Sequence, residues 1–299
     1  MKTDTPFKAG FISIIGKPNA GKSTLMNRLL GERLSIITAK AQTTRHRIRG
    51  IVTGDHFQLI YSDTPGVIEP KYKLHEKMME AVADSLSDAD LILWITDVNE
   101  THDETQVAEL LQNVRNREQA PVIFILINKI DQSDQQAVLE KVEYWKNFFP
   151  AQEIIPISAR HDFNIDLLSE RLLANLPEHP PFFPDDSLTD RSERFFAAEM
   201  IREQIFLHYE QEVPYCAEVV ITSFKEEEEQ IRVRADILVE RESQKAILIG
   251  KGGQKIKYLS RDARRTMQDF FGKSIFLQPY VKVDPDWRNK SRKLGRLGY

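Results

Sequence analysis

The sequence Gly16-Lys17-Pro18-Asn19-Ala20-Gly21-Lys22-Ser23 matches the pattern G-x-x-x-x-G-K-[ST] and directly follows the apolar segment Phe11–Ile15. The glycines allow backbone amides to converge on phosphate oxygens, and a helix expected at Ser23–Leu30 would add its positive N-terminal end. In this pattern Lys22 would reach the β- and γ-phosphates, and the Ser23 hydroxyl would bind Mg²⁺. These eight residues therefore predict a phosphate-binding loop between a strand and a helix, with a nucleoside triphosphate as ligand.

Apolar segments alternate with amphipathic ones over residues 1–176. The segments that predict strands are Phe11–Ile15, Gln58–Tyr61, Leu91–Ile95, Val122–Ile127 and Ile154–Ile157. They are short, rich in β-branched residues and almost continuously apolar, which is typical of strands buried on both faces of a parallel sheet. Between them, apolar residues recur at helical spacing, as in Leu74, Met78, Val82 and Leu86. The alternation predicts an α/β domain of three layers with a mostly parallel sheet.

The base would be selected by Asn128-Lys129-Ile130-Asp131, which follows one of these predicted strands. The Asp131 carboxylate can accept hydrogen bonds from N1–H and N2–H₂ of guanine, a donor pair that adenine lacks. We expect Asn128 to contact the opposite edge of the base and the Lys129 stem to pack on its face. Ser158 and Ala159, which follow another predicted strand, would brace the guanine through their backbone.

Asp63-Thr64-Pro65-Gly66 follows the strand expected at Gln58–Tyr61 and completes the phosphate site. Asp63 would hold Mg²⁺ through water, and the Gly66 amide would sense the γ-phosphate. All of these motifs lie at the carboxyl ends of expected strands, where open α/β sheets bind ligands. Together they resemble the GTPase superfamily, in its translation-factor-related branch, with GTP as substrate. In that resemblance Gln42–His46 looks like switch I, with Thr44 favoured as Mg²⁺ ligand and Thr43 as the alternative.

Val67 follows Gly66 at the position where Ras-like enzymes have a glutamine that orients water, and Ile68 comes next. Neither side chain can polarise water. The resemblance therefore implies a slow GTP hydrolase that depends on switch geometry, a partner or a monovalent cation, with Lys22 and Gly66 as its catalytic groups.

Two further residues are candidates for hydrolysis. Asn19 stands where cation-dependent relatives coordinate potassium, so stimulation by K⁺ is a hypothesis. Arg45 is a candidate to act on the γ-phosphate in cis, although a switch arginine is more often solvated or in contact with a partner.

Four prolines within eight residues interrupt the pattern, at positions 177, 180, 181 and 184, and predict a linker over residues 177–189. Asp190, with Glu193 three residues later, predicts a helix start. Two strand-like segments follow, Ala217–Phe224 and Gln230–Val239, on either side of the acidic run Glu226–Glu229, which predicts a solvated hairpin tip. Two helical patterns and a last strand, Ser274–Val283, complete the order helix, strand, strand, helix, helix, strand. That order is the order of an α+β type II KH domain, here residues 190–299.

A G-x-x-G sequence, Gly250-Lys251-Gly252-Gly253, lies between the two helical patterns. The surrounding segment, residues 245–273, has eight basic and two acidic residues, a net charge of +6. A glycine turn between helices lets a nucleic-acid backbone approach closely, and basic residues add electrostatic attraction. The candidate RNA-binding residues are Gly250, Lys251, Gly252, Gly253, Lys255, Lys257 and Arg261. The basic tail Trp287–Tyr299 predicts either an extension of the RNA surface or a mobile tail.

A P-loop GTPase domain followed by a type II KH domain resembles one family closely, the Era family of bacterial GTPases. The segments that carry the resemblance are Gln42–Ile48, Asp63–Gly66, Thr189–Phe195, Ile201–Glu203, Ile237–Lys245 and Leu297–Tyr299. The resemblance implies binding to single-stranded 16S rRNA near its 3′ end, a role in assembly of the 30S subunit, and contact with the inner membrane face. It implies no DNA partner, and we expect a monomer whose GTP or GDP state is coupled to RNA binding.

Composition limits the alternatives. With 41 Lys and Arg against 45 Asp and Glu, the net charge of −4 excludes a histone-like polycation but permits a local basic patch. The longest apolar run, Pro121–Ile127, is too short to span a bilayer, and Met1–Gly10 lacks a signal-peptide core. Cys216 is the only cysteine, so we expect a cytoplasmic protein without an intrachain disulfide.

Two other functions are alternatives to this one. In a membrane-surface signalling GTPase the basic stretch would meet anionic lipid, but no apolar insertion face adjoins that stretch. A GTP-powered RNA-modifying enzyme would need a nucleophile constellation, and none is present in the sequence.

Overall fold

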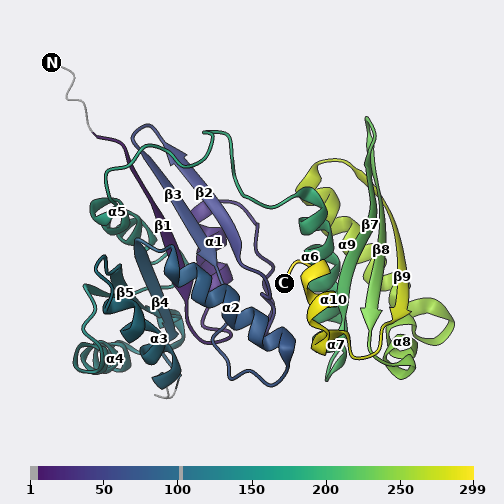
Figure 1. The fold of residues 1–299 in the computed structure, drawn as a ribbon, viewed down its shortest axis with the longest axis horizontal. Coiled ribbons are helices and arrows are strands. Elements are labelled where there is room, and N and C mark those ends of the chain that lie inside the picture. Colours follow the sequence, from purple (N-terminus) through teal and green to yellow (C-terminus); the bar gives the residue numbers. More distant parts are fainter. Residues whose placement is uncertain (1–5, 101–103) are drawn as a thin grey trace. The chain divides into compact units, whose positions relative to one another are not determined.

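The computed structural model describes residues 6–100 and 104–299. The chain forms two compact units (Figure 1). The first comprises Met1–Ser35, Thr44–Glu69 and Met78–Asp190, and the second comprises Ile36–Thr43, Pro70–Lys77 and Arg191–Tyr299. Of the predicted first domain, residues 1–5 and 101–103 lie outside the described residues.

The first unit is built on a six-stranded sheet with the strand order β2-β3-β1-β4-β5-β6. The strands are β1 (Lys8–Ile15), β2 (Ile48–Gly54), β3 (Phe57–Asp63), β4 (Leu91–Asp97), β5 (Val122–Asn128) and β6 (Glu153–Pro156). All neighbours are parallel except β2, which pairs antiparallel with β3. The five predicted strands are therefore confirmed. The sequence pattern does not predict β2, because this edge strand contains two glycines and no continuous apolar run.

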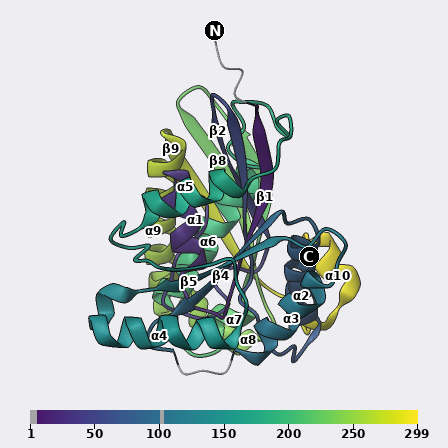
Figure 2. The same ribbon diagram turned by 90° about the vertical axis from the view of Figure 1, so that its left-hand side faces the viewer.

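Helices cover both faces of this sheet, as the three-layer prediction requires. Figure 2 shows α1 (Lys22–Leu30) and α5 (Ile165–Asn175) on one side and α2 (Lys73–Ser87) and α3 (Thr105–Arg115) on the other. The core below α2, α3 and α4 (Gln135–Phe148) includes Trp94 and Trp145, whose rings meet edge to face at 4.6 Å. Burial of these large apolar side chains holds the helices on the strands and fixes the sheet edge that carries the loops.

The proline-rich segment 177–189 is bound to the first unit along its length. The Gln58 side chain accepts hydrogen bonds from the backbone N–H groups of Phe182 and Phe183, at 2.8 and 3.0 Å. Farther along, the backbone N–H of Ile51 donates to the carbonyl oxygen of Leu188. These backbone and side-chain bonds explain why the segment groups with the first unit although prolines exclude it from regular structure.

Asp190 does not begin the next helix, which corrects the sequence analysis. Its carboxylate pairs with Arg49 at 3.3 Å, and Ser192 is the N-cap of α6 (Glu193–His208), accepting from the Phe195 N–H. A serine oxygen serves the same capping function as an aspartate oxygen, so the motif alone did not fix the position.

The second unit contains a three-stranded sheet with the order β7-β8-β9. Its strands are β7 (Glu218–Glu226), β8 (Gln230–Val239) and β9 (Ser274–Val283), and its helices include α6, α7 (Val213–Cys216), α8 (Glu242–Ile249) and α9 (Gln254–Phe271). β7 is antiparallel to β8, and β8 is parallel to β9. The predicted order of helices and strands is confirmed, and the acidic run ends β7 at an exposed turn.

The basic tail folds back onto the second unit, so of the two alternatives the mobile tail is wrong. It forms the short helices η3 (Trp287–Asn289) and α10 (Ser291–Arg296). The Trp287 ring is fully buried, and its Nε1–H donates to the carbonyl oxygen of Cys216 at 2.9 Å. Leu294 is also buried. The tail is rich in basic residues, but it is held in place by the buried apolar side chains of Trp287 and Leu294, which the charge count does not reveal.

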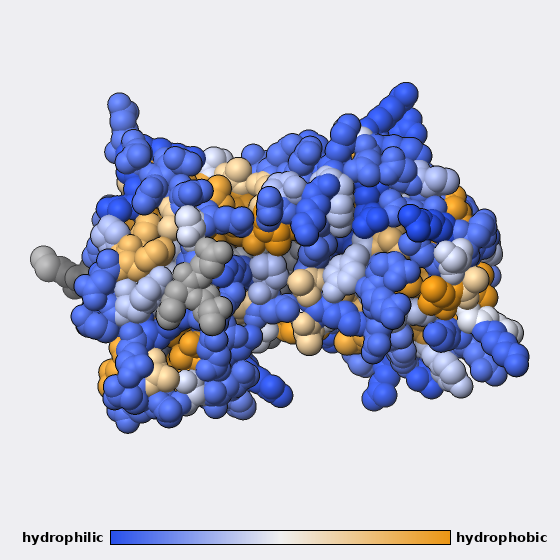
Figure 3. Space-filling view, turned by 90° about the horizontal axis from the view of Figure 1, so that it is seen from below, coloured by the Kyte–Doolittle hydropathy of each residue, from blue (hydrophilic) through white to orange (hydrophobic). Residues whose placement is uncertain are grey.

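Among the described residues, every helix is too short or too polar to span a bilayer. On the face of the molecule drawn in Figure 3, hydrophilic residues predominate and hydrophobic ones form small separate groups.

Candidate functional site

The phosphate-binding loop connects β1 to α1, as predicted, and two glycines determine its course. Gly16 and Gly21 have φ of 151° and 106°. A Cβ on Gly16 would lie 2.2 Å from the Ile95 carbonyl oxygen, and one on Gly21 would lie 2.2 Å from Nδ2 of Asn128. The loop therefore requires glycine at both positions for conformation and for space.

Lys22 is buried under this loop. Its Nζ donates to the carbonyl oxygens of Gly16 and Lys17, at 3.1 and 2.6 Å. Burial lowers the pKa of Lys22 to about 8, although nearby acids, Asp63 first among them, act in the opposite direction. The cation is thus poorly solvated and held among loop carbonyls, where an incoming phosphate would be its natural partner.

Three oxygen groups expected to bind Mg²⁺ lie together at the edge of this loop. The Ser23 hydroxyl donates to Asp63 Oδ2 at 2.6 Å and lies 2.9 Å from the Thr44 hydroxyl, which is 3.4 Å from the same carboxylate oxygen. The Thr43 hydroxyl instead donates to the Lys40 carbonyl oxygen and pairs with Thr38. Of the two threonines that the sequence left open, Thr44 is the one beside Ser23 and Asp63.

The second carboxylate oxygen of Asp63 supports a cation at this place. Asp63 is fully buried, and its Oδ1 has no hydrogen-bond partner among the residues described. Burial raises the pKa of Asp63 above its ordinary value, against the lowering effect of the Ser23 hydrogen bond and of Lys22. Oxygen ligands of this kind fit Mg²⁺.

The Asp63–Gly66 loop packs against the phosphate-binding loop. A Cβ on Gly66 would lie 2.6 Å from the backbone nitrogen of Pro18, and Val67 N–H donates to the Gly16 carbonyl oxygen at 3.1 Å. Thr64 donates through its hydroxyl to the Ile14 carbonyl oxygen, and Pro65 is buried beside it. These contacts bring the Gly66 backbone to the P-loop, as expected of a γ-phosphate sensor.

Val67 cannot orient water, because its side chain is 6% exposed and belongs to the apolar core beneath the helices. The side chain at this position points into the core, which explains physically why it cannot orient water as the glutamine of Ras-like enzymes does.

Asn128 connects three loops through one side chain. Its Nδ2 donates to the Ala20 carbonyl oxygen at 2.8 Å, and its Oδ1 accepts from the Ala159 N–H at 3.0 Å. The sequence motif predicts only a contact of Asn128 with the base edge and not this bracing role.

The residues expected to recognise guanine lie around this asparagine. The Ser158 hydroxyl donates to Asp131 Oδ1 at 2.6 Å, so Ser158 orients the carboxylate through its side chain and not only through its backbone. Lys129 has a φ of 64° and pairs with Asp97 at 2.7 Å. Asp97 was not identified from the sequence, although it ends β4 at the same sheet edge as the other motifs.

Three other switch and loop residues are placed by the structure. Asn19 is exposed at the loop apex, with a φ of 63°. Lys17 pairs with Glu100 at 3.3 Å, a contact that the sequence did not suggest. Arg45 is only 1% exposed, so of the situations considered for this switch arginine a solvated side chain is excluded.

In the second unit, the G-x-x-G sequence forms a turn between α8 and α9. Gly250, Gly252 and Gly253 have φ of 73°, 59° and 74°. A Cβ on Gly250 would collide with the Lys255 side chain, whereas Gly252 and Gly253 have nothing within 4 Å of that position. The last two glycines therefore present open backbone that a ligand strand can approach closely.

The predicted RNA-binding cations differ in their availability. Lys251 and Lys257 are exposed, and neither has an acidic partner in residues 6–100 or 104–299. Arg261 is also exposed, but its guanidinium pairs with Asp262 at 2.7 Å. Lys255 lies with its Nζ 5.8 Å from the Tyr209 ring centroid.

Comparison with known proteins agrees with this arrangement. The chain matches the model of the 50S ribosome-binding GTPase family over residues 11–129 and the KH domain model over residues 212–288. It is 41% identical to GTPase Era of Clostridium acetobutylicum over 295 residues, covering 98% of each chain. It is 41% identical to GTPase Era of Staphylococcus haemolyticus over 298 residues, covering 99% of this chain and 98% of the relative.

Two solved structures are similar over the whole fold. One is the crystal structure of Era in complex with MgGDPNP and nucleotides 1506–1542 of 16S ribosomal RNA, and the other is an Aquifex aeolicus Era variant bound to GDP and AlF4⁻. Each is 38% identical with a TM-score of 0.92, and each match covers 98% of this chain and 99% of the other. The chain is a GTP hydrolase with a KH domain, and it belongs to the Era family of GTPases.

Proposed function

We propose that this GTPase binds single-stranded 16S rRNA near its 3′ end through its KH domain and acts in assembly of the 30S ribosomal subunit. The open glycine turn between α8 and α9 is the observation that carries this proposal, since its backbone and its exposed lysines suit a phosphodiester strand. The similar Era structure in complex with nucleotides 1506–1542 of 16S ribosomal RNA supports the same class of ligand.

Crosslinking followed by sequencing of the bound RNA tests this function. We expect a peak at the 3′ end of 16S rRNA for the wild type and its loss for Gly252→Asp, which places a negative charge at the turn. Gly272→Asp is the matched control, because Gly272 also has a positive φ, of 66°, and open space around it, but lies at the far end of α9. An unchanged profile for Gly252→Asp would reject the glycine turn as the RNA site.

We extend the proposal to Mg²⁺ as the cofactor of GTP binding, held by Ser23, Thr44 and Asp63. The ion would neutralise phosphate charge when bound. The unpartnered Asp63 Oδ1 supports this assignment. Thr44→Ala is expected to raise the Mg²⁺ concentration needed for binding of a GTP analogue, whereas Thr43→Ala leaves it unchanged. The opposite order would assign the ligand to Thr43.

We also propose that the nucleotide state is coupled to RNA binding. The division between the two compact units falls between Thr43 and Thr44. Thr44 lies beside Ser23 of the phosphate-binding loop. A change in the position of Thr44 on nucleotide binding would therefore act directly on Thr43, its neighbour in the chain, which belongs to the second unit. RNA affinity measured with a GTP analogue and with GDP is expected to differ, and equal affinities would remove the coupling.

Stimulation by K⁺ through Asn19 is a further part of the proposal. Hydrolysis measured in KCl and in NaCl at equal ionic strength is expected to be faster in KCl. The difference should disappear in Asn19→Gly, which keeps the positive φ without the side chain. Equal rates for the wild type would contradict it.

The cytoplasmic location and the contact with the inner membrane stay predictions. Co-sedimentation with anionic liposomes, in competition with an A/C-rich oligoribonucleotide, separates lipid binding from RNA binding by the same basic segment.

A further inference from the structure

Two aromatic side chains lie exposed on the same face of the β7-β8-β9 sheet. Phe276 and Tyr280 on β9 are 42% and 52% exposed, whereas Ile275 and Leu277 between and beside them are buried. Because side chains alternate along a strand, the two rings point away from the face on which α6 and α9 pack. They are four residues apart, which places them about 13 Å apart along the strand.

The neighbouring strand supplies planar cations to the same face. In the β8–β9 register, Arg232 pairs with Phe276 and Arg234 pairs with Gln278. The Arg232 guanidinium carbon lies 5.5 Å from the Phe276 ring centroid, and Arg234 Nε donates to Gln278 Oε1 at 3.0 Å. Aromatic rings and guanidinium planes side by side on an open sheet are the groups on which unpaired bases stack.

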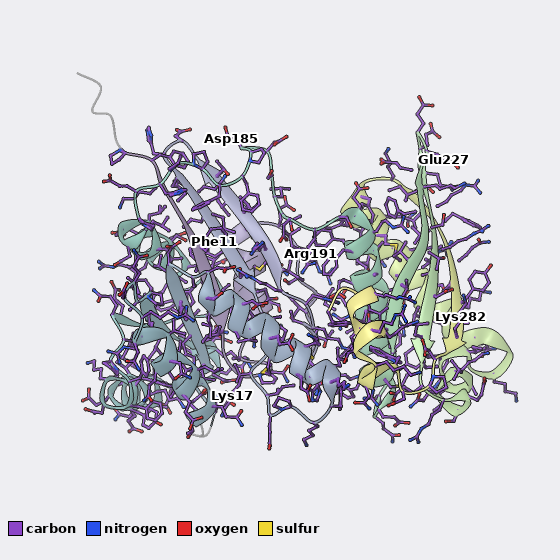
Figure 4. All side chains as sticks on the ribbon, viewed as in Figure 1. Phe11, Lys17, Asp185, Arg191, Glu227 and Lys282 are labelled. Carbon is purple, nitrogen blue, oxygen red and sulfur yellow. The ribbon has the colours of Figure 1, made fainter. Side chains whose placement is uncertain are left out.

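Two cations on this face, Lys225 and Arg234, have no acidic partner among the described residues, which favours a polyanion over an apolar protein segment. Lys225 lies in register with Arg232, and Lys282 pairs with Asp236 at 2.6 Å, the acid that faces Tyr280. At the hairpin tip, Glu227 pairs with Arg232 at 3.2 Å. Figure 4 shows Glu227 at that tip and Lys282 well away from it along the sheet.

The glycine turn and the two rings are connected through β9, which is an edge strand of the sheet. α8, which ends at Ile249, packs against β9, and α9, which begins at Gln254, packs on the face of β9 opposite the rings. A single strand that leaves the turn therefore has to pass the β9 edge to reach the rings.

We propose that Phe276 and Tyr280, with Arg232, Arg234 and Gln278, form a second stacking surface for unpaired RNA bases. The inference rests on the proposed function, because the RNA is delivered by the glycine turn. It extends the bound length beyond the roughly four nucleotides that a KH groove holds.

Oligoribonucleotides of two lengths test the inference. Phe276→Ala and Tyr280→Ala are each expected to weaken binding of a ten-nucleotide A/C-rich strand about tenfold. Binding of a four-nucleotide strand should not change, since it is held at the turn alone. Phe163→Ala is the matched control, because Phe163 is 53% exposed but lies in the first unit.

Tyr280→Trp gives a direct readout of stacking. The three natural tryptophans, at positions 94, 145 and 287, are fully buried, so an exposed indole at position 280 is distinguishable by its accessibility to a soluble quencher. We expect the ten-nucleotide strand to quench this indole and to shield it, and the four-nucleotide strand to do neither.

The outcomes distinguish a failure of the proposed function from a failure of the second stacking surface alone. If the wild type binds neither strand, the proposed function fails and this inference fails with it. If Gly252→Asp abolishes binding, but the aromatic variants bind the longer strand like the wild type and the indole is not quenched, only the second surface is refuted.

Discussion

The side-chain amide of Asn128 donates to the carbonyl oxygen of Ala20 at 2.8 Å, so the base-recognition motif holds the phosphate-binding loop directly. The same side chain accepts from the Ala159 N–H, which ties in the loop after β6. Gly21 leaves just enough room for this amide. One buried side chain therefore fixes the relative positions of three loops that would contact a single nucleotide.

Asn128→Ala is expected to destabilise the ligand-free protein by about 2 kcal/mol, because two buried backbone groups lose their partner. GDP affinity should fall by at least about tenfold, since the loops are no longer held in register. Calorimetry and GDP titration measure the two effects. Asp134→Ala, which removes the N-cap of α4, serves as control: it should cost about 1 kcal/mol and leave GDP affinity unchanged. Equal affinity in both variants would contradict the bracing role.

Lys22 predicts how nucleotide affinity depends on pH. Its pKa in the free protein is lowered to about 8 by burial, so above that pH the free side chain is neutral. A phosphate favours the charged form, and binding must then take up a proton. GDP affinity measured in EDTA is expected to fall as pH rises above about 8, by up to tenfold per unit. Guanosine, which has no phosphate, corrects for titration of the base; a GDP profile parallel to that of guanosine would refute the prediction.

Substitution of Asp63 is expected to increase the stability of the ligand-free protein and to reduce its function. Its pKa is raised by burial, so the ionised form is disfavoured in the folded state and stability is lost as pH rises past the unfolded value. Asp63→Asn removes that charge and keeps an oxygen that can accept from Ser23. The variant is expected to unfold at a higher temperature without ligand and to lose Mg²⁺-dependent binding of a GTP analogue. A lower unfolding temperature would show that Asp63 is satisfied without a cation.

Much of the nucleotide site could be predicted because its motifs are contiguous in sequence. Gly16–Ser23 and Asn128–Asp131 each combine a strand end with residues of specific chemistry, and the parallel sheet brings such ends to one edge. Contacts between motifs could not be predicted. Neither the bond from Asn128 to Ala20 nor the pair of Lys129 with Asp97 leaves a local pattern, since each joins residues from different strands.

Burial was the other property that the sequence concealed. Arg45 and Trp287 both lie in polar or basic stretches, and both are buried. β2 has few apolar residues because, as an edge strand, it is supported on one side only, by β3. In each case tertiary packing decided the environment, and local composition pointed the other way.

Val67 gives a prediction for hydrolysis. Val67→Gln restores the residue type of Ras-like enzymes, but the side chain enters the apolar core and not the phosphate site. We expect no gain in the single-turnover rate and a loss of about 1–3 kcal/mol in stability. Ile68→Gln, at a half-buried position, is the control and should be destabilised less. A large increase in rate would place the side chain of residue 67 beside the γ-phosphate.

The packed tail predicts a graded loss of stability. Trp287→Ala removes a fully buried ring and should cost about 3–5 kcal/mol, whereas Trp287→Phe keeps most of the volume and loses mainly the bond to Cys216, about 1 kcal/mol. Arg292→Ala changes an exposed residue of the same tail and should have no measurable effect. Calorimetry of the full chain measures the order of stability of the three variants. A mobile tail would leave all three variants equal to the wild type, so this series decides whether the C-terminal segment is part of the domain that we propose binds RNA.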